Sequence, residues 1–97
     1  MLRFSLGSEY LKRDATGKAL EHLEQAVVLD PGYSAAWKLY GKACERAGQA
    51  KRAANAYSRG IEAAQEHGDM QAMKEMQVFL KRLDKSQAQD RGSKRTL

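Results

Sequence analysis

The sequence predicts an all-α fold in which five helices pack as an antiparallel stack within one domain. Strong helix formers dominate the 97 residues, and Pro31 is the one proline. β-Branched aliphatic residues are few, and no segment alternates apolar and polar residues as a half-buried strand does. Apolar residues recur instead at helical spacing, and their pattern repeats once along the chain.

Two apolar stripes at helical spacing predict the first helix pair, over residues 1–33. The first stripe consists of Leu6, Gly7, Tyr10 and Leu11. After a turn at 14–17, the second stripe consists of Ala19, Leu20, Leu23, Ala26 and Val27. Pro31 disfavours helical geometry in the residue before it, so the second helix ends there.

The segment that follows predicts a second helix pair, over residues 34–67. Ser34 is a candidate N-cap, because its hydroxyl can accept a hydrogen bond from a first-turn amide. One stripe consists of Trp37, Tyr40, Gly41 and Cys44, and the other of Ala53, Ala54, Tyr57 and Ile61. Gly48 marks the turn between these helices, and His67-Gly68 closes the second one.

A fifth helix is predicted over residues 69–84, with an apolar stripe of Met73, Met76, Leu80 and Leu83. No partner helix follows it, so we expect a capping helix whose apolar face covers the second pair. Residues 85–97 contain no stripe and carry four basic residues against one acidic residue. We therefore expect a domain at 1–84 and a disordered basic tail at 85–97.

Two glycines within predicted helices, Gly7 and Gly41, occupy the same position in the two helix pairs. Glycine inside a helix costs about 1 kcal/mol relative to alanine. This cost predicts a close approach between paired helices that a side chain would block. Ala19 and Ala53, early in the partner helices, fit the same close packing.

These residues resemble the tetratricopeptide repeat (TPR) family, which repeats a helix–turn–helix unit at the spacing that separates Gly7 from Gly41. The first repeat matches the family pattern with Leu6, Gly7, Tyr10, Ala19, Leu23, Ala26 and Pro31. The second repeat matches it with Trp37, Tyr40, Gly41, Cys44, Ala53, Tyr57 and Gly60. The match covers about residues 1–67. Arg3 departs from it in place of a tryptophan, Cys44 in place of a tyrosine and Gly60 in place of an alanine.

Composition and motifs indicate no enzyme, no cofactor and no metal site. His22, His67 and Cys44 share no helix face, and Cys44 is expected to be a small buried core residue. His67 lies near Glu66 and Asp69, which is a weak metal signal. A single cysteine forms no internal disulfide, and no stretch reaches the roughly 18 uncharged apolar residues of a membrane span. We expect a cytoplasmic protein without a membrane partner.

The resemblance implies non-catalytic binding of a protein or peptide partner in a concave groove, as an adaptor or scaffold does. The residues that it places in this groove are Phe4, Ser8, Leu11, Lys12, Lys38, Leu39, Lys42, Arg46, Lys74, Val78 and Lys81. Basic and apolar residues together favour an acidic or amphipathic partner segment. Alternatively, these lysines only solvate a helix face.

Two further functions are open. The net charge of +5 and the basic tail allow nucleic-acid binding, although residues 1–84 supply only +2 of that charge. Self-association is the other, because Leu2, Phe4 and Leu6 on the first helix have no predicted cover. The carboxylate clamp of chaperone-docking TPR domains is not expected. The positions that would supply it hold Phe4, Ser8, Leu39, Gln71 and Glu75.

Overall fold

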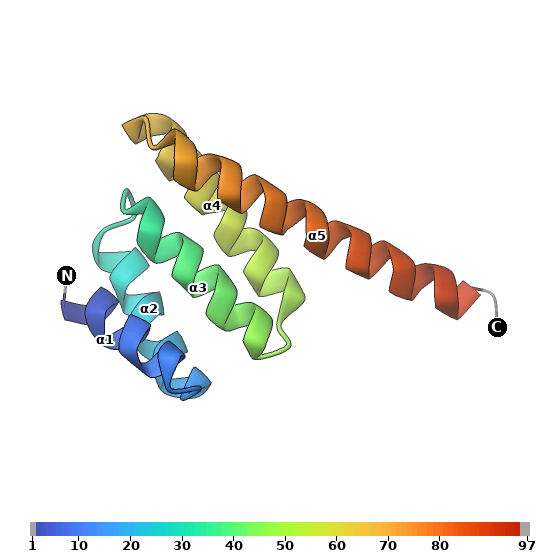
Figure 1. The fold of residues 1–97 in the computed structure, drawn as a ribbon, viewed down its shortest axis with the longest axis horizontal. Coiled ribbons are helices and arrows are strands. Elements are labelled where there is room, and N and C mark those ends of the chain that lie inside the picture. The colour runs from blue at the N-terminus through green and yellow to red at the C-terminus, as the bar shows by residue number, and fades with distance from the viewer. Residues whose placement is uncertain (1, 96–97) are drawn as a thin grey trace.

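The computed structural model describes the backbone of residues 2–95 and the side chains of residues 2–85. It contains five helices, which confirms the predicted all-α class (Figure 1). In chain order they are α1 (Leu2–Lys12), α2 (Thr16–Leu29), α3 (Ser34–Arg46), α4 (Ala50–His67) and α5 (Met70–Arg95). Each helix packs against the next one along the chain.

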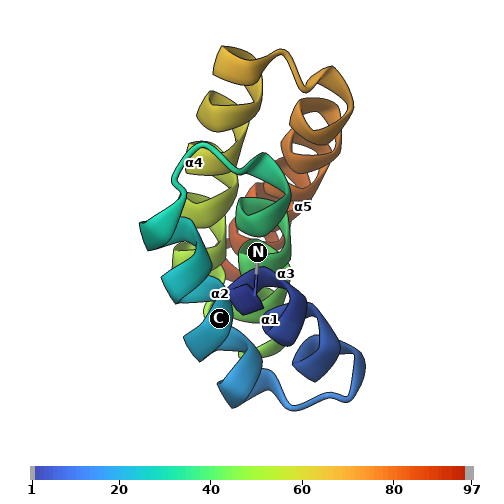
Figure 2. The same ribbon diagram turned by 90° about the vertical axis from the view of Figure 1, so that its left-hand side faces the viewer.

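The helices form two layers (Figure 2). α1, α3 and α5 lie in one layer, and α2 and α4 lie in the other. Contacts also join α1 to α3 and α3 to α5, so α3 is the central helix. This arrangement places the first helices of both repeats and α5 side by side.

Gly7 and Gly41 make the predicted close contacts. A Cβ atom added at Gly7 would lie 2.5 Å from Cγ of Leu23, which is too close for two carbon atoms. A Cβ atom at Gly41 would overlap the ring of Tyr57 even more. Because Leu23 and Tyr57 also occupy equivalent positions, both repeats use the same contact.

The core lies between the two layers. The largest fully buried side chains in the described part are Tyr57, Leu23, Met76 and Cys44. Cys44 is thus the buried small residue that the sequence predicted. Met73 is also buried, so the apolar stripe of α5 covers the second repeat as expected of a capping helix.

The start of α3 differs from the prediction. Tyr33, and not Ser34, occupies the N-cap position, and no side chain caps the helix there. Ser34 is the first helical residue, and its hydroxyl donates instead to Oδ2 of Asp69 at 2.8 Å. The other oxygen of Asp69 accepts a hydrogen bond from the backbone N–H of Ala72 at 3.3 Å. Asp69 therefore joins the start of α3 to the first turn of α5.

The end of α5 also differs from the prediction. The helix runs to Arg95 instead of ending near residue 84. No proline occurs in this stretch, and its lysine, glutamine, alanine and arginine residues favour helix. The side chains of residues 86–97 lie outside the described residues. The division into a domain at 1–84 and a disordered tail at 85–97 stays a prediction.

Candidate protein-interaction groove

A hollow of about 190 Å³ lies between α1 and α3. Its walls are formed by Ser8, Leu11, Lys12, Leu39, Lys42 and Arg46. All six residues are among those that the sequence assigned to the groove. They come together because α1 and α3 lie next to each other in one layer, with corresponding turns facing each other.

Two of the cations around this hollow are held in place by neighbouring groups. The ammonium of Lys42 lies 5.0 Å from the ring centroid of Phe79 in α5, a cation–π contact. Arg46 donates a hydrogen bond to the backbone oxygen of Leu11 at 2.8 Å, and its guanidinium lies 3.5 Å from Asp14. Phe79 was not among the predicted groove residues, and its place next to Val78 gave no sign of this contact, because adjacent residues of a helix point to different faces.

Lys38 is paired rather than available to a partner. Its ammonium lies 3.2 Å from Oε1 of Glu75, so the ion pair bridges α3 and α5. Lys38 was predicted to be one of the cations of the groove, but its charge is balanced by Glu75. Spacing along one helix gives no sign of this pair, because the two residues lie on different helices.

The remaining predicted groove residues are spread along the same layer. Phe4 packs on Tyr33 with 4.9 Å between ring centroids, and it lines a different hollow at the start of α1. Lys74, Val78 and Lys81 are exposed on α5. The structure thus gathers six of the eleven predicted residues around one hollow, and the other five lie outside it.

A hydrogen bond joins a buried tyrosine of α4 to an exposed glutamate of α3. The hydroxyl of Tyr57 donates to the carboxylate of Glu45, and burial, with this hydrogen bond, raises the pKa of Tyr57 above its ordinary value of 10.0. Burial also raises the pKa of the Cys44 thiol above its ordinary value of 9.0. Both groups are therefore neutral near pH 7, and neither is poised for proton transfer or nucleophilic attack.

A network of hydrogen bonds joins α2, α3 and α4. Arg52 donates to the hydroxyl of Tyr40 at 2.7 Å and to Oε2 of Glu24 at 2.5 Å. Burial raises the pKa of Tyr40 above its ordinary value of 10.0. Tyr40 lies on α3, Glu24 on α2 and Arg52 on α4, so the network fixes the two repeats against each other.

The two histidines have structural neighbours. His22 stacks on Tyr10 with 5.3 Å between ring centroids, and its Nδ1 lies 3.1 Å from a guanidinium nitrogen of Arg3. The ring of His67 packs against the backbone at Gly32. Nowhere in the described part do three or more histidine, cysteine, aspartate or glutamate side chains gather as they would around a metal ion. None of the helices there is long and apolar enough to cross a membrane.

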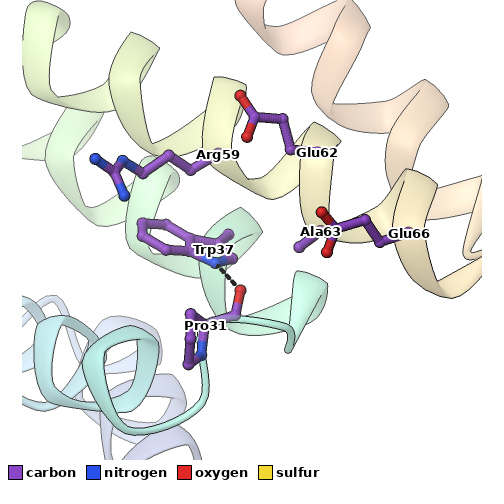
Figure 3. A pocket seen from close by; sticks show the side chains of 6 residues that line it. All are labelled: Pro31, Trp37, Arg59, Glu62, Ala63 and Glu66. Carbon is purple, nitrogen blue, oxygen red and sulfur yellow. Dashed lines mark hydrogen bonds between the residues drawn. The ribbon is translucent and has the colours of Figure 1, made fainter.

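The junction between the repeats forms a further hollow, of about 150 Å³, on the outer side (Figure 3). The indole nitrogen of Trp37 donates to the backbone oxygen of Pro31 at 2.8 Å. Arg59, Glu62 and Glu66 of α4 rim this hollow. The hydrogen bond holds the loop between α2 and α3 against the second repeat. This explains why a Pro–Gly turn and a tryptophan stand six residues apart at this junction.

Known proteins share this architecture. The profile of the tetratricopeptide repeat family matches residues 10–76. TPR repeat-containing protein PA0015 of Pseudomonas aeruginosa is 49% identical over 86 residues, which are 89% of this chain and 82% of that protein.

Two solved structures are also similar. The solution structure of protein BPP2914 from Bordetella parapertussis has a TM-score of 0.84 and 43% identity, over 94% of this chain and 79% of that one. That of a tetratricopeptide repeat domain protein from Salinibacter ruber has a TM-score of 0.79 and 33% identity, over 84% and 83% of the two chains. With both its sequence pattern and its helix packing matched, this chain belongs to the tetratricopeptide repeat family.

Proposed function

We propose that this protein is a non-catalytic adaptor that binds an acidic, amphipathic segment of a partner protein along the α1–α3–α5 layer. Repeats of this family generally mediate protein–protein interactions, and proteins that contain them are generally non-catalytic. The observation that carries the proposal is the hollow between α1 and α3, where cations surround an apolar floor.

Leu11 and Leu39 supply that floor. Burying one apolar side chain of a partner on this floor contributes about 1.5–3 kcal/mol to the free energy of binding. This contribution anchors a segment but does not distinguish one apolar segment from another. Lys12, Lys42 and Arg46 stand around the floor and would select a segment that carries carboxylates beside its apolar residue.

The ion pair between Lys38 and Glu75 divides the layer into two parts. In the part that contains this pair, the ammonium of Lys38 lies 3.2 Å from the carboxylate of Glu75, so the two charges neutralise each other. On the side of the hollow, Lys12 takes part in no ion pair within residues 2–85. We therefore expect the carboxylates of the partner to lie near Lys12 and Lys42.

A fluorescence-polarisation titration tests this function with a defined probe. The probe is a labelled helical peptide with leucines on one face and glutamates beside them. A matched peptide has glutamines in place of the glutamates. We expect the first peptide to bind at least about tenfold more tightly than the second, and the difference to shrink as salt is added.

Variants locate the binding site. The double variant Lys12→Glu, Lys42→Glu is expected to lose most of the affinity for the acidic peptide while it keeps its helical circular dichroism. Its matched control, Lys51→Glu, Arg59→Glu, reverses two exposed charges on α4 in the opposite layer. Equal affinity for both peptides, or an equal loss in both variants, would contradict the proposal.

A further inference from the structure

The end of α2 carries a ridge of exposed apolar side chains. Val28 and Leu29, its last two residues, are 74% and 73% exposed. Leu2, at the start of α1, is 71% exposed and lines the same hollow as Leu29. The large apolar side chains that are exposed in the described part number five, and three of them gather here. Apolar side chains gathered at one place indicate an interaction surface, whereas isolated ones do not.

A hollow lies on each side of this ridge. One of about 210 Å³, between the start of α1 and the end of α2, is lined mainly by apolar and aromatic groups that include Phe4 and Tyr33. The other, of about 250 Å³, lies between α2 and α4 and includes Val28 in its wall. A surface that contains both a ridge and a hollow can be complementary to the same surface of a second copy. When a second copy is related by a two-fold axis, the ridge of each copy can enter the hollow of the other.

The charges at the rim obey the same symmetry. Arg3 and Asp30 both line the hollow that contains Leu29, and their charges are opposite. The hydrogen bond between Arg3 and His22 uses one guanidinium nitrogen, and Asp30 takes part in no ion pair within residues 2–85. In a two-fold pairing, Arg3 of one copy can face Asp30 of the other, and such a contact would occur twice.

We infer that this surface, made of Leu2, Arg3, Val28, Leu29 and Asp30, binds a second copy of the chain in a symmetric dimer. It overlaps the surface that the sequence suggested for self-association, since Leu2 and Phe4 line its hollow, but Leu6 is half-buried and lines neither hollow. The dimer leaves the α1–α3 hollow open, since Leu2 and Lys12 lie at opposite ends of α1, about 15 Å apart along the helix. Each dimer would therefore present two grooves.

Sedimentation velocity from micromolar to millimolar protein tests the inference. We expect the mass of the wild-type chain to rise toward twice the monomer mass as the concentration rises. Leu29→Glu should raise the dissociation constant by more than about tenfold, because it places two charges inside the apolar contact. Leu29 is exposed in the monomer, so the helical circular dichroism of this variant should not change. Met70→Glu, an equally simple change at an exposed methionine on α5, should leave the dimer intact.

Charge reversal tests the symmetry. Arg3→Glu and Asp30→Arg should each weaken the dimer, and the chain that carries both changes should regain most of the lost affinity. A wild-type protein that stays monomeric at millimolar concentration would overturn the inference, as would a Leu29→Glu variant that dimerises normally or a double variant without recovery. The acidic peptide should bind Leu29→Glu as it binds the wild type, so failure of the dimer is distinguishable from failure of the groove.

Discussion

The ring of Tyr57 lies against the backbone of Gly41, at a distance that leaves no room for a Cβ atom. Leu23 lies against Gly7 in the same way, one repeat earlier in the chain. In each repeat, one large buried side chain thus fills the space that the glycine of the partner helix leaves open. This contact sets how closely the two helices of a pair approach each other.

Gly41→Ala should destabilise the protein by about 1–3 kcal/mol, the usual cost of overpacking a core. The variant gains about 1 kcal/mol of helix propensity, but the ring of Tyr57 is fully buried and also packs on Phe79, so it has little room to move. Gly17→Ala is the control, because a Cβ atom there meets nothing within 4 Å. Urea unfolding should show this control as stable as the wild type or more so. A Gly41→Ala variant that is more stable than the wild type would contradict the close approach between Gly41 and the ring of Tyr57.

Ser34 and Asp69 should contribute cooperatively to stability. Ser34 is buried and its hydroxyl donates to Asp69 at 2.8 Å. This hydrogen bond to a charged acceptor joins the start of α3 to the start of α5. We expect Asp69→Ala to cost about 1.5–3 kcal/mol, since it leaves the hydroxyl without an acceptor and removes the bond to Ala72. A double-mutant cycle with Ser34→Ala measures the coupling by thermal unfolding. Additive effects of the two changes would disprove the coupling.

Stability should fall as the pH rises through the range above about 9. The folded-state pKa values of Cys44, Tyr40 and Tyr57 are raised above 9.0, 10.0 and 10.0, mainly by burial. Above these ordinary values, the unfolded chain has lost protons that the folded chain retains, so the free energy of unfolding decreases with pH. Below about pH 9 this contribution is fully present.

The measurement is urea unfolding between pH 7 and pH 11, for the wild type and for Tyr57→Phe. Tyr57→Phe removes one of the titrating groups, so its stability should fall less steeply above about pH 10. Loss of the hydrogen bond to Glu45 lowers its stability at pH 7, and the slope is therefore the quantity to compare. Parallel curves for the two proteins would show that Tyr57 does not keep its proton.

Lys38 should matter for stability more than for binding. Lys38→Glu places two carboxylates near each other across α3 and α5, and we expect it to cost up to about 1 kcal/mol, because the pair is partly exposed. Adding Glu75→Lys should restore most of this loss. Lys38→Ala should change the affinity for the acidic peptide by less than about twofold, whereas Lys12→Ala should weaken it more. A larger effect from Lys38→Ala would move the binding site toward Glu75.

The sequence alone predicted that there are five helices, that their pattern repeats, and that helices approach closely at Gly7 and Gly41. These features follow from local rules. Glycine within a helix is costly, apolar residues at helical spacing must face a core, and Pro31 ends the helix before it. The repeat also made Leu23 and Tyr57 equivalent before their positions were known. The resemblance to the TPR family placed eleven residues in one groove, and six of them line one hollow because α1 and α3 lie in one layer.

Only the tertiary structure decided which charges are paired and which apolar side chains are exposed. Lys38 meets Glu75 and Ser34 meets Asp69 across helices, at separations of 37 and 35 residues that no helical period relates. Val28 and Leu29 stand beside Val27 in one apolar run, yet Val27 is buried and its two neighbours are exposed. The spacing of residues along a helix determines which of them share a face. What that face meets depends on the helices packed around it.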